Sequence, residues 1–279
     1  MPVRPIDQTT VLVTGATDGL GRGVASELAR RGASVLVHGR SAERGKQLVD
    51  ELRRTTGNDR IELYLADLAD LGQVADLADR VTGEHDRLDA LVNNAGIGSG
   101  LPDSREREES ADGYELRFAV NYLAGYALTE RLLPLLRRSA PARIVNVASL
   151  GQQAIEFDDV MLMQGYDGWR AYRQSKLAQV MYTVDLAERL PAAEVTANSL
   201  HPATFMPTKI VTEEQDYTVD ALEFGIANVV RLVVDPDLAD VTGRFFDRDA
   251  EAKADSQAYD PAARQRLRDV SRALLAAAS

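Results

Sequence analysis

The sequence predicts an α/β fold in which seven parallel strands form one doubly wound sheet with helices on both faces. Three observations support this prediction. Short apolar runs rich in β-branched residues alternate with segments of helical periodicity, as in sheets whose strands are joined by crossover helices. A glycine-rich turn joins the first apolar run to the first helical segment. The length of 279 residues, 45% of them hydrophobic, suits a single large domain.

The seven strands are predicted at residues 10–14, 33–37, 61–65, 89–93, 143–147, 195–200 and 243–246. The first helix is predicted over Gly21–Arg31, because Gly32 offers a C-terminal stop. Ser41 can cap the second helix. A last helix is predicted over 260–279, and the core of the domain over about residues 8–250 of the 1–279 chain.

Composition narrows the class of protein. The chain has no cysteine, which excludes disulfides and thiolate metal sites. Its net charge of −11 argues against binding to nucleic acid or anionic membranes. The N-terminus lacks the apolar stretch of a signal peptide, and no run approaches the roughly 20 apolar residues of a membrane span. We therefore expect a cytoplasmic protein whose partner is a small molecule.

The glycine-rich turn predicts a dinucleotide site. It lies directly after a strand and before a helix, so backbone N–H groups can approach a pyrophosphate at the helix N-terminus. The alternative is an ordinary glycine turn, which the strand–turn–helix context disfavours. The candidate cofactor contacts in this turn are Gly15, Thr17, Asp18, Gly19, Leu20 and Gly21.

The end of the second predicted strand indicates which dinucleotide binds. NAD-binding folds usually place an acid there to hold the ribose 2′-hydroxyl, but the segment 38–41 contains none. The Arg40 guanidinium can bind a 2′-phosphate through two charge-assisted hydrogen bonds, and Ser41 can add a third. A solvated arginine at a strand end is the alternative. The sequence therefore favours NADP(H).

Tyr172 and Lys176 are the strongest chemical signal. Residues four apart share one helical face, so the pair alone is weak evidence. Here the pair follows Ser149 by 23 residues, and Ser149 directly follows a predicted strand. Taken with Asn121, the glycine turn and the loop at 93–96, this order resembles the short-chain dehydrogenase/reductase family across nearly the whole chain.

The resemblance implies a Rossmann-type domain with the catalytic residues Asn121, Ser149, Tyr172 and Lys176. Tyr172 would exchange a proton with the substrate oxygen, and the Lys176 ammonium would lower the pKa of the phenol and hold the nicotinamide ribose. Ser149 would bind the carbonyl oxygen, and the Asn121 backbone carbonyl would hold a water. Tyr166 is a rival acid, although its neighbour at the next turn is an arginine, which suits the role of the lysine poorly.

Further cofactor contacts are implied by the same resemblance. They are Asp67 and Leu68 at the adenine, Asn94, Ala95 and Gly96 along the cofactor, Tyr172 and Lys176 at the ribose, and Pro202 and Thr204 at the nicotinamide. Asp67 can also serve as a helix cap. Either Thr204 or Thr208 can contact the nicotinamide. No metal is expected, since the three histidines show no metal-ligand spacing.

The stretch between Ser149 and Tyr172 is similar to the retinol-dehydrogenase-like branch, which handles lipophilic ketones, aldehydes and alcohols. The segments 151–170 and 204–225 are therefore expected on the substrate side, or as packing under a loop. We expect an oxidoreductase; the alternatives are an NADP(H)-binding sensor without turnover, or an epimerase or dehydratase. Family members often pair through helices that correspond here to 113–136 and 169–190, so a homo-oligomer is an alternative to a monomer.

Overall fold

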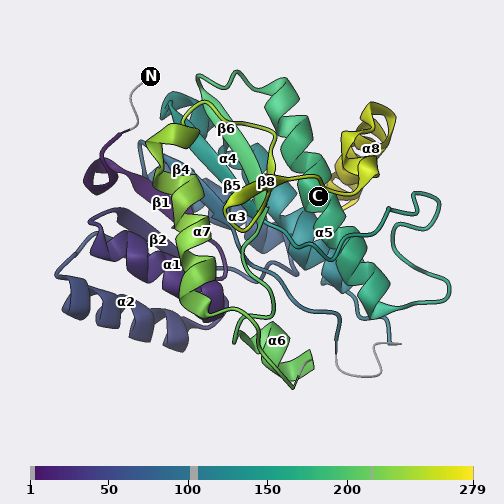
Figure 1. Ribbon diagram of the computed structural model, residues 1–279, viewed down its shortest axis with the longest axis horizontal. Helices are drawn as coiled ribbons and strands as arrows, with labels where there is room; N and C mark the ends of the chain where they lie inside the picture. Colours follow the sequence, from purple (N-terminus) through teal and green to yellow (C-terminus); the bar gives the residue numbers. More distant parts are fainter. Residues whose placement is uncertain (1–3, 101–105, 215, 279) are drawn as a thin grey trace.

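The computed structural model describes residues 4–100, 106–214 and 216–278, and within them eight strands form one sheet (Figure 1). Their order is β3-β2-β1-β4-β5-β6-β7-β8. The strands are β1 (Thr10–Val13), β2 (Ser34–Gly39), β3 (Ile61–Leu65), β4 (Ala90–Asn93), β5 (Ala142–Val147), β6 (Val195–His201), β7 (Phe245–Asp247) and β8 (Ala250–Ala252).

The predicted doubly wound fold is confirmed, and β1 to β7 pair in parallel. The predicted number of seven strands is one too low. The sequence analysis missed β8, a three-residue strand that pairs antiparallel with β7 after a turn at Arg248–Asp249. So short a strand shows no apolar alternation, and its residues are exposed or half-buried.

Helices cover both faces of the sheet (Figure 1). They are α1 (Gly19–Arg30), α2 (Ala42–Thr56), α3 (Leu71–Glu84), α4 (Ala124–Arg138), α5 (Gly168–Arg189), α6 (Lys209–Glu214), α7 (Leu222–Val234) and α8 (Pro261–Ala277). One hydrophobic core lies under α1, α2 and α7, and the other under α3, α4 and α5. Val11 and Val13 belong to the first core and Leu12 to the second, because successive side chains of a strand point to opposite faces. Within the described ranges, no helix has the length and apolar character needed to cross a membrane.

Side-chain caps explain where several helices begin. Asp18, Ser41, Asp70, Asp167 and Asp260 each accept a hydrogen bond from a backbone N–H at the start of the following helix. The cap predicted at Ser41 is therefore present. The cap before α1 also sets the direction of the helix whose N-terminus follows the glycine turn.

The C-terminal helix α8 packs against α5 and the segment before α4. The Tyr122 hydroxyl lies 2.7 Å from Ser271 Oγ, and Arg268 pairs with Asp185 at 2.6 Å. Part of the surface of the helices at 113–136 and 169–190, considered above for pairing between copies, is thus covered by α8 of this chain.

Candidate active site

The carboxyl ends of β1, β4, β5 and β6 meet near the point where the strand order reverses, between β1 and β4. Ligands of open α/β sheets bind in the crevice at such a point. The glycine turn follows β1, Asn94–Gly96 follows β4, Ser149 comes after β5, and Pro202 follows β6. The fold therefore brings the predicted cofactor and catalytic residues to one edge of the sheet.

The glycine turn fits directly against the loop after β4. A Cβ at Gly21 would lie 2.3 Å from the Gly15 carbonyl oxygen and 2.4 Å from Asn94 Nδ2. Gly15 has a φ of +62°, and a Cβ there would lie 2.9 Å from the Cα of Ala95. From the sheet side, the Gly15 N–H donates to His38 Nδ1 at 3.2 Å. The turn therefore presents bare backbone next to the N-terminus of α1, which suits a pyrophosphate.

Arg40 and Asp67 face each other at the ends of β2 and β3. Arg40 is 69% exposed, and its Nη1 lies 3.8 Å from Asp67 Oδ2. So weak and exposed an ion pair leaves the guanidinium available for a phosphate. Asp67 also accepts a hydrogen bond from the Ala69 N–H at 2.9 Å, while Asp70 caps α3. The capping role considered for Asp67 thus belongs to Asp70.

Arg44, in the first turn of α2, was missed by the sequence analysis. Ser41 Oγ accepts a hydrogen bond from the Arg44 N–H at 3.3 Å, and the Arg44 guanidinium lies 3.7 Å from the Asp18 carboxylate. A helix that begins at Ser41 directs side chains of its first turn back toward the glycine turn, so the sequence did carry a signal. Two arginines therefore lie near the turn. Of the other predicted contacts, Thr17 packs against Gly39, and Leu20 and Leu68 are buried.

Ser149, Tyr172 and Lys176 lie together beside this cofactor region. A Cβ at Gly151 would lie 3.4 Å from Ser149 Oγ and 3.9 Å from Tyr172 Cε1, so the two side chains meet there. Lys176 Nζ lies 5.7 Å from the centre of the Tyr172 ring. A Cβ at Gly96 would lie 3.5 Å from the same Nζ. The lysine thus stands between the tyrosine and the loop after β4.

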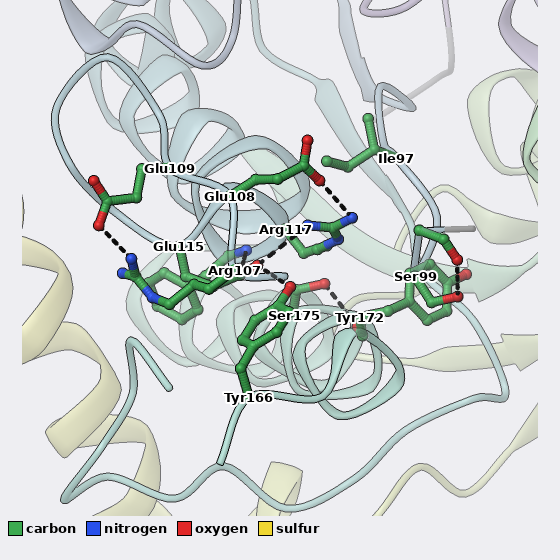
Figure 2. A network of polar contacts seen from close by, with 12 residues as sticks. Ile97, Ser99, Arg107, Glu108, Glu109, Glu115, Arg117, Tyr166, Tyr172 and Ser175 are labelled. Carbon is green, nitrogen blue, oxygen red and sulfur yellow. Dashed lines mark hydrogen bonds and ion pairs between the residues drawn. The ribbon is translucent and has the colours of Figure 1, made fainter. Parts of the chain in front are cut away.

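Asn121 connects the chemical centre to that loop. It lies in a π-helical segment, Phe118–Leu123, that leads into α4. Its Oδ1 accepts a hydrogen bond from the Ile97 N–H at 2.8 Å, and its Nδ2 donates to Ser175 Oγ at 3.0 Å. The Ser175 hydroxyl donates to the Tyr172 carbonyl oxygen (Figure 2). A π turn interrupts the regular helical ladder and is frequent at functional sites, but the sequence carries no signal for it.

Burial raises the pKa of the Tyr172 phenol above its ordinary value. A hydrogen bond with Ser149 acts against this shift, and the Glu214 carboxylate adds to it. The direction is opposite to the lowering expected from Lys176. In this structure the desolvation of the phenol is the larger effect, and the ammonium is held by other acceptors.

Those acceptors lie on β5 and α5. Lys176 Nζ donates to the Val147 carbonyl oxygen and to Gln179 Oε1, each at 3.0 Å. Burial lowers the pKa of Lys176 to about 8. Gln179 was not among the predicted site residues, and its place one turn after Lys176 was the only signal for it.

A buried ionic network holds the 151–170 segment (Figure 2). The Tyr166 hydroxyl donates to Glu115 Oε1 at 2.9 Å, and Glu115 Oε2 accepts from the Phe118 N–H at 2.7 Å. Arg117 lies 3.8 Å from the same carboxylate, and Glu115 and Arg117 are only 1% and 4% exposed. Because its hydroxyl already donates to Glu115, Tyr166 is a poor rival to Tyr172 as an acid, and burial and Glu115 also raise its pKa.

Thr204 and Thr208 have different surroundings. The Thr204 hydroxyl accepts a hydrogen bond from Arg248 Nη2 at 2.8 Å, and its N–H donates to Asp220 at 2.7 Å. Thr208 lies at the glycine turn, where a Cβ on Gly19 would be 3.3 Å from Thr208 Cγ2. Of the two candidates, Thr208 lies against the glycine turn, and the Thr204 hydroxyl is bound by Arg248.

The short helix α6 carries Glu214 onto the loop after β4. Glu214 Oε1 accepts a hydrogen bond from the Gly100 N–H at 3.2 Å. Burial raises the pKa of Glu214, while hydrogen bonds from Ser99 and Gly100 act against this shift. Sequence reasoning missed this residue. Residue 215 of the predicted 204–225 segment lies outside the described residues.

The histidines are held by protein groups. His38 Nε2 lies 3.2 Å from the Ala66 carbonyl oxygen, and His201 Nε2 lies 3.1 Å from Thr204 Oγ1. Burial lowers the pKa of both imidazoles to about 4. His85 bonds to the Tyr64 hydroxyl at 2.7 Å.

Comparison with known proteins agrees with this geometry. Residues 9–218 match the family model described as short chain dehydrogenase. Retinol dehydrogenase 13 of Mus musculus is 42% identical over 196 residues, which cover 69% of this chain and 57% of that protein. The chain thus spans less than two thirds of that relative.

Solved structures share the fold over nearly the whole chain. An uncharacterized protein from Mycobacterium paratuberculosis is 29% identical, covers 98% of this chain and 96% of its own, and has a TM-score of 0.79. A short chain dehydrogenase from Shigella flexneri, complexed with NADP, is 28% identical, with 86% and 97% coverage and a TM-score of 0.70.

Proposed function

This chain belongs to the short chain dehydrogenase family, in its retinol-dehydrogenase-like branch, and we propose that it is an NADP(H)-dependent oxidoreductase. It would interconvert a ketone or aldehyde with the corresponding alcohol on a lipophilic small molecule. The observation that carries this proposal is the convergence of Ser149, Tyr172, Lys176 and Asn121 beside the glycine turn.

The reaction follows from the chemistry of these side chains. A bound nicotinamide supplies or accepts the hydride. The Ser149 hydroxyl donates to the substrate oxygen and shares the charge that develops there. Tyr172 gives its proton to this oxygen during reduction and takes it back during oxidation. The Lys176 ammonium favours the phenolate, which burial alone disfavours.

Three features support NADP(H) over NAD(H). Arg40 is exposed at the ribose end, Arg44 adds a second cation near it, and the Shigella flexneri relative was crystallised with NADP. The acids Asp67 and Asp18 are each paired with one of these arginines. We assign the nicotinamide contact to Thr208, because the Thr204 hydroxyl is engaged by Arg248.

Apolar side chains near Tyr172 support a lipophilic substrate. The Trp169 ring meets the Tyr172 ring edge-on at 6.4 Å and is 37% exposed. Leu150, just before the 151–170 segment, and Met163, within it, are 47% and 68% exposed. Singly exposed apolar residues are common on protein surfaces, so the Trp169–Tyr172 contact carries this part of the proposal.

The test is turnover of NADPH with a panel of lipophilic ketones and aldehydes, in the wild type and in Tyr172→Phe. The substitution keeps the ring but removes the hydroxyl that exchanges the proton. Turnover should fall by at least about a hundredfold, the usual range for such a group, while NADPH affinity changes little. Lys176→Ala should damage both properties. Undiminished turnover in Tyr172→Phe would refute the mechanism, and an inactive wild type that still binds NADPH would favour a sensor.

A further inference from the structure

The ammonium of Lys176 is held by two acceptors inside the protein. Val147 offers a backbone oxygen, which no substitution of that residue removes, and Gln179 offers a side-chain oxygen. Lys176 and Gln179 are each 5% exposed, and they lie three residues apart on one face of α5. An ammonium has three N–H donors, so these two bonds leave one for the site.

We propose that Gln179 is a positioning residue, whose amide oxygen keeps the Lys176 side chain charged and directs its third N–H toward Tyr172 and the cofactor. The catalytic role inferred for this contact rests on the proposed function, but the contact itself does not. An ammonium can only donate, so the amide oxygen must be the atom that faces it.

The surroundings of Lys176 make a neutral acceptor important. Other polar side chains around it include Tyr172 on α5, Asn121 on the π-helical segment and His201 on β6. Burial, rather than a neighbouring charge, is the cause of its lowered pKa. A hydrogen bond to the charged form is therefore the available means of keeping the amine protonated near neutral pH. A carboxylate at position 179 would do this more strongly, but it would neutralise the charge that the phenolate needs.

The turn of α5 that carries Gln179 is itself fixed from the sheet. The Thr183 hydroxyl donates to the Gln179 carbonyl oxygen at 2.8 Å, and Asn146 Nδ2 on β5 donates to the Thr183 hydroxyl oxygen at 2.9 Å. The acceptor is thus held by the strand that also provides Val147.

The chain has only four lysines, at positions 46, 176, 209 and 253, and all except Lys176 are exposed. An NMR titration of protein labelled with ¹³C at the lysine ε-carbon therefore reads the pKa of Lys176 without any turnover. Gln179→Met keeps the shape but removes the acceptor, so the pKa should fall, by about one unit or more. Gln179→Glu should raise it by a similar amount. If either variant fails to fold, Gln179→Asn replaces it. The asparagine side chain is one methylene too short to reach Lys176, so this variant should lower the pKa as Gln179→Met does.

Gln174→Met is the matched control. Gln174 lies on the same helix, is 2% exposed, and donates its amide to the Ala154 carbonyl oxygen at 2.9 Å. Its loss should leave the pKa of Lys176 unchanged. In active enzyme, the alkaline limit of kcat/KM should move down in Gln179→Met and up in Gln179→Glu. Shifts of the same sign in both variants, or an equal shift in Gln174→Met, would overturn the inference. An inactive wild type with opposite NMR shifts would refute the proposed function and leave the contact established.

Discussion

The two sides of this site are held together in different ways. On the cofactor side, within residues 10–100, bare backbone makes the closest contacts: glycines of the turn after β1 lie against the loop after β4, which is distant in sequence. On the substrate side, segments such as 106–117 and 151–170 are fastened by hydrogen bonds and ion pairs between polar side chains, such as Tyr166 with Glu115. The first arrangement requires glycine at fixed positions, which a sequence shows directly, whereas the second depends on which polar side chains meet in the fold.

The strongest test of the cofactor side is Gly21→Ala. A methyl group there would meet the Gly15 carbonyl oxygen at 2.3 Å, and backbone cannot rotate away as a side chain can. Overpacking of this kind typically costs about 1–3 kcal/mol, so a turn displaced by this clash should bind NADPH roughly 10- to 100-fold more weakly. Titration of NADPH by fluorescence measures it.

Gly83→Ala is the control for that substitution. Gly83 lies in α3 with nothing within 4 Å of an added Cβ. Alanine favours a helix over glycine by up to about 1 kcal/mol, so this variant should be slightly more stable and bind NADPH normally. If neither alanine substitution reduced NADPH affinity, the close approach of backbone at the glycine turn would not be required for cofactor binding.

Arg40→Ala tests the ribose end of the same side. Loss of a charged, hydrogen-bonded phosphate contact should weaken NADPH by about 1.5–3 kcal/mol and leave NADH almost unchanged. Arg44→Ala should have the same selectivity but a smaller effect, because Asp18 competes for its guanidinium at 3.7 Å. Calorimetric titration with both cofactors measures this selectivity. Equal losses for NADPH and NADH in Arg40→Ala would contradict the assignment.

This contrast explains which parts of the fold and of the site could be predicted from the sequence. Each parallel strand lies within two residues of its predicted range, because its apolar run and its turn are local signals. Glu214 was missed because it binds the Gly100 N–H across a helix and a loop that meet only in the fold. Gln179 was missed because helical spacing alone does not show that its amide oxygen accepts from Lys176. The expected lowering of the pKa of Tyr172 was wrong in this structure for a related reason: spacing reveals the nearby ammonium, but not the burial that outweighs it.

Both sides should weaken together in acid, because each contains a buried neutral histidine. The pKa of His38 and that of His201 are lowered from 6.5 to about 4. A lowered folded-state pKa gives stability that is full above pH 6.5 and is lost as the pH falls toward 4. Each histidine should cost about 2 kcal/mol between pH 7 and 5, as measured by urea unfolding. His38→Gln and His201→Gln should each remove one histidine's share, about half of the combined loss; an unchanged slope in both would refute this origin.

Tyr166→Phe gives the smallest effect and separates the two sides most cleanly. It removes the bond to Glu115 that fastens the 151–170 segment to the start of the α4 region. The loss of one such bond, about 1 kcal/mol, should raise KM for a lipophilic substrate roughly fivefold and leave NADPH affinity unchanged. Tyr182→Phe is its matched control, because Tyr182 makes the same kind of bond, to Glu130 at 2.9 Å, between α5 and α4. That variant should lose stability without any change in KM. A higher KM in both variants would mean that substrate binding depends on the overall stability of the fold, rather than on the Tyr166–Glu115 hydrogen bond.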